Sequence, residues 1–575
     1  MNALQRLARQ IGCSAAVLLF GLLPPAIGQE ATDALSRGRN LMGEGNVDEA
    51  VAQFSEAIRL NPESTEAYLN RGGAYWEKDD LDLAIADYTR AIQLDPKLAA
   101  AHYSRGLAYL NQRQIEKAVT DLDEAIKLNP TYADAYLSRG SAYSEAGELD
   151  KAIADCSQVI RLDPRRAGAY FHRGVAYMEK RQWDEAIADF TQAIQLDPED
   201  AESYVYRGSC RWEKNELDEA IADCTKAAQL NPGLGAAYYF RGLSHLDKTS
   251  WDEALADLNR AVELAPQDPD VRFARGTVHQ QMGDREKAAA DYSEAIRLNP
   301  KFPEAYLNRA RAHWEDGQVD ETIADASQAI QLGLEHAEAY CFRGGARSKQ
   351  GELDKAIDDL NEAVRIDPKL VRAYYYRGNT YYKQGNLDQA VADLSHALQL
   401  DPRYADAYFA RATAYWIRKD LRRTIADCTA AIRFGLRNDQ VYCYRGAAYY
   451  SAGDYDRAIV DLTEAIRIDP KRIDAYYYRG VAYYKKDNVD RAIADLTSAI
   501  QLDPKNPKAY TNRGYMYGKK GQLDRAIADF AQAIQLDPKN GQIYYLRGLV
   551  YRSQGDTEKA DADSAKARQL GYEAQ

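Results

Sequence analysis

Arginine and aspartate recur at fixed positions along this chain of 575 residues. An Arg stands at residue 37 and at every 34th residue after it up to Arg547, and Gly usually follows it. From Arg71 onward, each of these arginines has an Asp 16 residues later, as in Arg71 with Asp87 and Arg479 with Asp495. A guanidinium can bind a carboxylate through two parallel hydrogen bonds, so we expect a ladder of internal ion pairs. A row of anion-binding arginines is the alternative, and the recurring carboxylate favours the pairs.

Three histidines share the same spacing and raise the question of a metal site. His245, His279 and His313 lie 34 residues apart, at a position where most copies of the pattern have Tyr. Metal ligands must converge on one point about 2 Å from each donor, whereas equivalent positions of neighbouring helices are roughly 8–10 Å apart. We therefore interpret these side chains as packed rings that replace Tyr, and we predict no metal site.

The cysteines follow the period as well. Cys156, Cys224 and Cys428 share a position that is Leu or Phe in most other copies, so burial as small apolar side chains is expected. The pairs worth testing for a disulfide are Cys428 with Cys443 and Cys210 with Cys224. No phosphate-binding glycine loop, nucleophile elbow or zinc-ligand spacing is present. We predict that the chain is not an enzyme and needs no cofactor.

The elements that carry these residues are helices. Between residues 523 and 534, apolar side chains follow the spacing i, i+3, i+4, i+7, which is typical of one buried helix face. Tyr510, Gly514 and Tyr517 belong to a preceding helix, and Gly521 breaks the chain between the two. Asp537-Pro538 ends the second helix, because proline cannot continue it. Each 34-residue copy is therefore a helix–turn–helix hairpin, and the fold class is all-α.

Numbered from residue 31, each copy has Arg at position 7, nearly all have Gly at 8 and Ala at 20 and 27, and most have Pro at 32. This pattern resembles the tetratricopeptide repeat. The resemblance covers residues 31–574 in sixteen copies and implies a right-handed superhelical solenoid of antiparallel hairpins. Small residues at these positions let two helices approach closely. Residues 541–574 are expected to act as a cap, because Asp561 and Ser564 replace apolar residues there.

The resemblance also implies that positions 2, 5, 6, 9, 12 and 13 line a concave groove. In that frame the groove is aromatic, and aromatic rings are frequent in binding hot spots. Position 13 is acidic in the early copies and basic in several later ones, which would orient an extended charged segment, although Lys is common there in such repeats. The predicted protein-binding residues are Trp76, Trp212, Trp314, Trp416, Tyr375, Tyr382, Tyr477, Tyr484, Lys383, Lys485 and Lys519.

The N-terminus differs from the repeats. Arg6 and Arg9 precede an apolar stretch at residues 11–23, and Pro24-Pro25 and small residues follow. This layout is typical of a cleavable signal peptide, here residues 1–28, and the stretch is shorter than the roughly 20 residues that span a bilayer. We expect an exported protein, periplasmic or secreted, that does not insert into the membrane after cleavage. An uncleaved anchor is the alternative.

A net charge of −13 makes nucleic acid an unfavourable ligand, because phosphate backbones repel an acidic protein. The function that we predict is therefore a non-catalytic scaffold that binds proteins or peptide segments in its groove, in the periplasm or cell envelope. The alternative is an architectural protein that self-associates and has no separate ligand.

Overall fold

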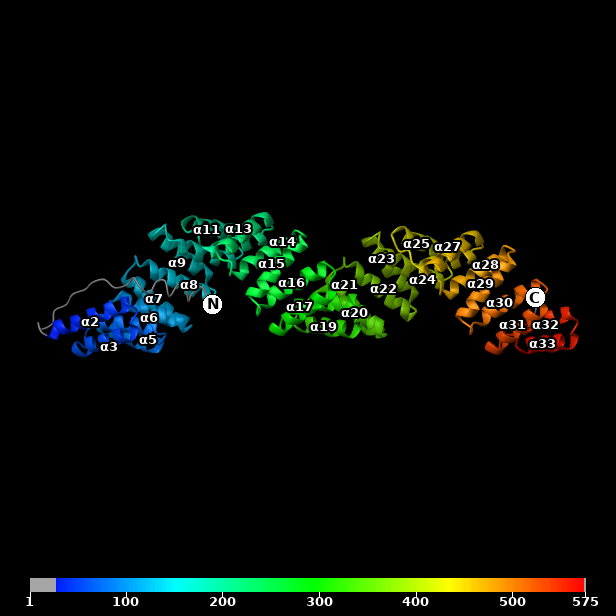
Figure 1. Cartoon of the computed structure of the whole chain (residues 1–575), viewed down its shortest axis with the longest axis horizontal. Coiled ribbons are helices and arrows are strands. Elements are labelled where there is room, and N and C mark those ends of the chain that lie inside the picture. The colour runs from blue at the N-terminus through cyan, green and yellow to red at the C-terminus, as the bar shows by residue number, and fades with distance from the viewer. Residues whose placement is uncertain (1–26, 573–575) are drawn as a thin grey trace. The chain divides into compact units, whose positions relative to one another are not determined.

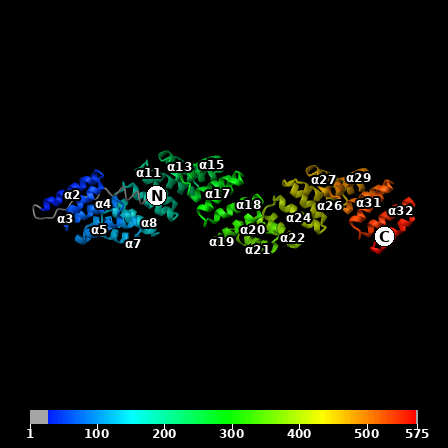
Figure 2. The same ribbon diagram turned by 60° about the horizontal axis from the view of Figure 1, so that its bottom comes forward.

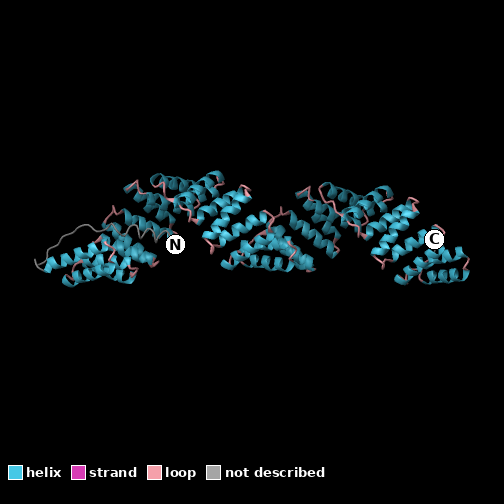
Figure 3. Cartoon of the chain, viewed as in Figure 1, coloured by secondary structure: helices cyan, strands magenta, loops and turns pink. Residues whose placement is uncertain are grey.

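The computed structural model describes residues 27–572, which form 32 helices and no strand (Figure 3). The predicted all-α class is confirmed. The chain divides at Leu298 into a first unit and a second unit, and each is described by itself. The predicted signal peptide falls almost entirely on residues 1–26, which lie outside the described residues.

The helices of the first unit follow one another in pairs with short connections (Figure 1). They are α2 (Ile27–Gly43), α3 (Val47–Leu60), α4 (Thr65–Glu77), α5 (Leu81–Leu94), α6 (Ala99–Asn111), α7 (Ile115–Leu128), α8 (Ala133–Glu145), α9 (Leu149–Leu162), α10 (Ala167–Glu179), α11 (Trp183–Leu196), α12 (Ala201–Glu213), α13 (Leu217–Leu230), α14 (Gly235–Asp247), α15 (Trp251–Leu264), α16 (Pro269–Gln281) and α17 (Arg285–Leu298).

The second unit has the same alternation (Figure 2). Its helices are α18 (Pro303–Glu315), α19 (Val319–Gln331), α20 (Ala337–Gln350), α21 (Leu353–Ile366), α22 (Val371–Gln384), α23 (Leu387–Leu400), α24 (Ala405–Ile417), α25 (Leu421–Arg433), α26 (Asp439–Ser451), α27 (Tyr455–Ile468), α28 (Ile473–Lys485), α29 (Val489–Leu502), α30 (Pro507–Lys519), α31 (Leu523–Leu536), α32 (Gly541–Gln554) and α33 (Thr557–Gln569).

The turn inside each hairpin is set by position 15 of the repeat, which adopts a left-handed backbone in every copy. Nine copies meet this requirement with Gly, such as Gly385 with a φ of 82°. The others place an L side chain there, such as Thr249 with a φ of 58°. Because left-handed backbone is unfavourable for a β-branched residue, the turn is maintained by the packing of the two helices rather than by its own preference.

The two helices of a hairpin approach closely at position 8. A Cβ placed on Gly72 would lie 2.6 Å from the ring of Tyr88, and one on Gly344 would lie 2.7 Å from Leu360. Ala84, at position 20, has no exposed surface. A large side chain from the second helix therefore packs directly on the backbone of the first, as the small residues of the pattern predict.

Successive first helices of the repeats also contact one another within each unit, as in α12 with α14 and α20 with α22. The second helices, which have odd numbers, have no contacts of that extent among the described residues. The first helices therefore form the more closely spaced layer, which is the inner layer of a curved stack. The expected groove positions lie on these first helices.

In the last hairpin, the α33 side chain of Asp561 is 74% exposed and pairs with Arg552. No helix within residues 27–572 combines the length and the apolar character needed to cross a membrane.

Candidate functional site

The recurring Arg and Asp residues form internal ion pairs. The Arg71 guanidinium donates from Nε and Nη2 to the two Asp87 carboxylate oxygens, each at 2.8 Å. Arg479 and Asp495 have the same geometry, also at 2.8 Å. Asp87 is 6% exposed and Asp495 is 7% exposed. The hydrogen bond to Asp87 raises the pKa of Arg71 above its ordinary value. We call this series of pairs the Arg–Asp ladder.

The ladder also connects neighbouring repeats, which the sequence reasoning missed. Arg71 donates from Nη1 to the Ser55 hydroxyl of the preceding repeat at 3.0 Å, and Arg479 donates to Thr463 at 3.0 Å. The available signal is position 25, which is Ser, Thr, Asn or Asp in every copy up to the fourteenth. With these partners satisfied, the arginines are structural rather than anion-binding.

Of the histidines at position 11, His313 contacts the same ladder. His313 Nε2 lies 3.5 Å from Asp325 in the second unit. His279 is 8% exposed, and burial lowers its pKa. Arg211 fills the equivalent position in α12 and donates to Asp223 at 2.8 Å. Within residues 27–572, no group of three or more His, Cys, Asp or Glu side chains could hold a metal ion.

The six described cysteines are free and buried. Neither pair proposed for a disulfide is therefore joined. Burial raises the pKa of the Cys210 and Cys428 thiols to about 12. These thiols stay protonated and serve as small core side chains.

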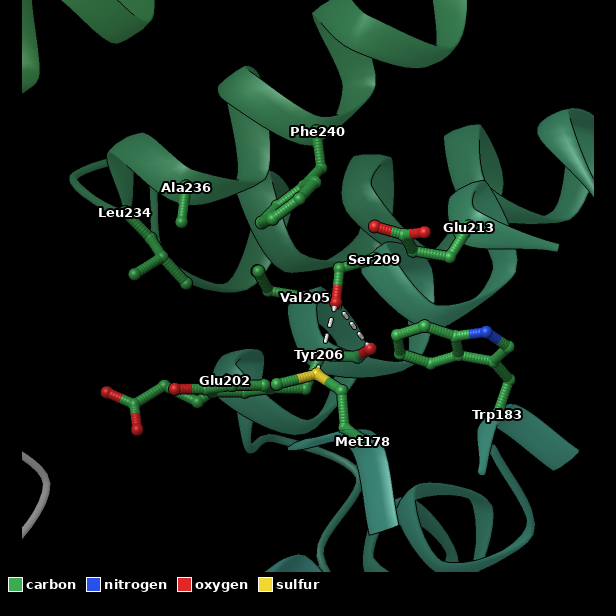
Figure 4. Close-up of a pocket in the computed structure, with 10 residues that line it drawn as sticks. All are labelled: Met178, Trp183, Glu202, Val205, Tyr206, Ser209, Glu213, Leu234, Ala236 and Phe240. Atoms are coloured by element: carbon green, nitrogen blue, oxygen red, sulfur yellow. Dashed lines mark hydrogen bonds between the residues drawn. The ribbon is translucent and has the colours of Figure 1, made fainter. Parts of the chain in front are cut away.

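A pocket of about 640 Å³ opens on the inner layer of the first unit (Figure 4). Its walls come from α10, α11, α12, α14 and the residue before α14. Apolar side chains dominate, among them Met178, Trp183 and Phe240. Eight of the ten lining residues occupy groove positions 2, 5, 6, 9, 12 and 13. The positions implied by the resemblance therefore do surround a concave site.

Sequence reasoning identified one of these ten residues, Glu213, as part of the acidic row at position 13, and none of the other nine. It weighted Trp212, which instead lies behind the pocket wall: its ring packs on Phe240 with centroids 6.2 Å apart. The Trp212 indole N–H donates to Asp247 at 2.7 Å. Aromatic residues at position 6, such as Tyr206 and Phe240, are the signal that could have identified the pocket.

In the second unit, Trp314 crosses the inner layer. Its indole N–H donates to the Tyr376 hydroxyl at 3.0 Å, and the two ring centroids are 5.3 Å apart. A Cβ on Gly345 would lie 3.2 Å from the Trp314 ring, so this glycine leaves room for the indole. Lys349 Nζ lies 3.8 Å from the centre of the same ring. Trp314 therefore spans from α18 over α20 to α22.

The other predicted aromatic rings lie on the first helices of their repeats, where they are half-buried rather than fully exposed. Their positions are as follows: Trp76 packs on the core around Tyr88, Trp416 is edge-on to Tyr444, Tyr375 lies against Tyr404, Tyr477 accepts from Asn512, Tyr484 is edge-on to Tyr515, and Tyr382 is partly covered.

The three predicted lysines are exposed on the inner layer and differ in their contacts. Lys383 donates to the Ser348 carbonyl at 2.7 Å, and burial together with Lys349 lowers its pKa. Lys485 lines an open hollow of about 470 Å³ beside the α26–α27 turn. Lys519 lies 5.7 Å from the Tyr515 ring centre.

Family models for the tetratricopeptide repeat match most of the chain. Models described as Tetratricopeptide repeat match residues 35–99, 103–167, 171–235 and 241–313. A model described as TPR repeat matches residues 344–385, 378–416, 446–487, 482–521 and 514–555. The chain belongs to the tetratricopeptide repeat family. Repeats of this kind form protein–protein interaction scaffolds, generally without catalytic activity.

Solved structures that resemble the chain include three tetratricopeptide-type proteins. The Cut9–Hcn1 hetero-tetramer of APC/C is 14% identical over 85% of this chain and 97% of that one, with a TM-score of 0.38. YrrB, titled a TPR protein with an unusual peptide-binding site, is 21% identical over 31% and 92%, with a TM-score of 0.29. MamA is 31% identical over 29% and 96%, with a TM-score of 0.27. No curated protein matches the chain.

Proposed function

We propose that this protein is an exported scaffold that binds segments of partner proteins on the inner layer of its repeats. The observation that carries the proposal is the pocket on α10–α14, because its lining belongs to the groove positions. Concave, largely apolar sites with a few polar groups are the usual binding places on proteins. A net charge of −13 favours protein rather than nucleic acid as the partner.

Export is supported by the basic and apolar pattern of residues 1–28. Detection of the protein in a periplasmic or culture fraction, with its N-terminus determined by mass spectrometry, tests this part. A cytoplasmic protein that retains residues 1–28 would contradict it.

Groove binding is tested by photo-cross-linking in the cell of origin. A photoreactive phenylalanine analogue replaces Trp76 or Tyr382 on the inner layer, and Val460 of α27, which is 67% exposed, serves as the control. We expect covalent adducts with other proteins from the inner positions and none from Val460. Adducts from Val460 alone would overturn the proposal.

Self-association is the alternative assembly. Light scattering of the purified chain at two concentrations distinguishes it. A mass that rises with concentration, together with cross-links only to a second copy, would favour the architectural role.

A further inference from the structure

The α10–α14 pocket has an apolar floor that the protein's own side chains leave open. Met178 and Ser209 meet at its base, where the Ser209 Oγ lies 3.8 Å from the Met178 sulfur. The Ser209 hydroxyl donates to the Tyr206 carbonyl at 2.8 Å, so it needs no ligand (Figure 4). Trp183 and Phe240 supply aromatic walls. A site of this kind suits an apolar side chain of a bound segment.

The rim of the pocket is acidic. Glu213 lines it, and its carboxylate lies between Phe240 and Trp183 in the view of Figure 4. Glu179 follows Met178 at the end of α10. Burial raises the pKa of Tyr206, and the charges of Glu202, which also lines the pocket, and of Glu179 add to this shift. Burial raises the pKa of Glu179 itself. No lysine or arginine lines the pocket.

These two carboxylates are not used inside the protein. The lysines that follow them pair elsewhere: Lys180 with Asp150, and Lys214 with Asp184 at 2.6 Å. Within residues 27–572, neither Glu179 nor Glu213 takes part in an ion pair. A cationic group between them would gain two charge contacts and an aromatic face for a cation–π interaction.

We propose that the α10–α14 pocket receives a basic segment of a partner protein, with an apolar side chain on the pocket floor and a flanking Lys or Arg at the Glu179–Glu213 rim. This inference rests on the proposed function and names the chemistry of the partner at one site. Charge complementarity selects a basic segment over an acidic one, and the apolar floor selects it over a purely polar one.

Three labelled peptides test the proposal by fluorescence polarisation with the full chain. GSKLKFKSG has basic and apolar residues, GSELEFESG reverses the charge, and GSKSKSKSG removes the apolar side chains. We expect the first peptide to bind at least about tenfold more tightly than either of the others, and more weakly at high salt. Equal affinity for the first two peptides would overturn the proposal.

Two variants test whether the first peptide binds in this pocket. Glu213→Lys reverses the rim charge and should weaken the first peptide about tenfold. Its matched control is Glu145→Lys, which changes the net charge equally at the same repeat position two repeats earlier and should leave the affinity unchanged. Met178→Trp combined with Ser209→Gly fills the pocket with an indole and should abolish binding. If circular dichroism shows that the double variant does not fold, the two charge variants still decide whether the first peptide binds at the pocket rim.

The outcomes separate this inference from the proposed function. Identical affinities of Glu213→Lys and Glu145→Lys would reject the pocket as the site. If cross-links form at Trp76 or Tyr382 while the first peptide does not bind, the basic-segment proposal fails and groove binding stands. If no inner position cross-links, the proposed function fails by its own test.

Discussion

Two equivalent regions, four repeats apart, show how one scaffold gives an open or a filled inner surface. The open region is residues 178–240 of the first unit, and the filled region is residues 314–376 of the second. Trp314 takes the place of Met178, and its indole reaches Tyr376, the equivalent of Phe240. The open region keeps a pocket of about 640 Å³, whereas in the filled region the protein's own indole lies across the inner layer.

The regions also differ in charge while sharing their internal supports. Lys349 replaces Glu213 at position 13, and Lys349 lies against the Trp314 ring. Both regions nevertheless have a ladder Asp that binds two arginines, Asp223 and Asp359. The Arg–Asp ladder therefore maintains the framework in both regions, whereas a few inner side chains determine whether a ligand can enter.

The largest expected effect is a loss of stability that both regions should share. Asp223→Ala leaves Arg207 and Arg211 without their carboxylate, and Asp359→Ala does the same to Arg343 and Arg347. Each change should lower the free energy of unfolding of its hairpins by about 3 kcal/mol, because partly buried charges lose their partner. Hydrogen exchange in α12–α13 and α20–α21 measures it. Very unequal losses would show that the framework is not the same in both regions.

Trp314→Met should convert the filled region into an open one. The change removes the hydrogen bond to Tyr376 and the contact with Lys349, so stability should fall by about 2 kcal/mol. Around the site that opens, position 13 holds Lys349 and the neighbouring Lys383 as well as Glu315, so the charge there is net positive. The acidic peptide GSELEFESG should therefore bind about tenfold more tightly than it binds the unchanged chain. Unaltered polarisation with this peptide would show that Trp314 does not close a site.

Thr249 and Gly385 are equivalent turn residues that follow the open and the filled region, with φ of 58° and 82°. Thr249→Gly should raise the free energy of unfolding by about 1 kcal/mol, because Gly adopts left-handed backbone without a Cβ penalty. Gly385→Thr should lower it by a similar amount. Urea denaturation of the two variants checks both signs, and a destabilising Thr249→Gly would contradict the assignment of strain.

A pH effect should be confined to the open region. Burial raises the pKa of Glu179, so this carboxylate is protonated earlier than an ordinary Glu as the pH falls. The affinity of GSKLKFKSG should therefore fall about threefold between about pH 7 and pH 5, since the lysines of the peptide stay charged. His172 stays neutral across this window, because burial lowers its pKa to about 4. In Glu179→Gln the pH dependence of this affinity should become smaller. An unchanged pH dependence would show that another group is responsible for it.

Much of the framework was predictable because it repeats. The pairing of Arg71 with Asp87 follows from a spacing that recurs in nearly every copy. The link to Ser55 was missed, since position 25 varies among several polar residues and no single residue type marks it. The four tryptophans were weighted by type alone, but Trp212 supports the pocket wall and Trp314 crosses Gly345.

By itself the sequence determined the hairpin, its period and the internal pairs, because each depends on residues that are close along the chain or in a neighbouring copy. Only the tertiary structure decided which inner positions are open. Whether Met178 leaves a space or Trp314 occupies one depends on side chains from the first helices of three successive repeats. The repeat pattern does not specify how the volumes of these side chains add up.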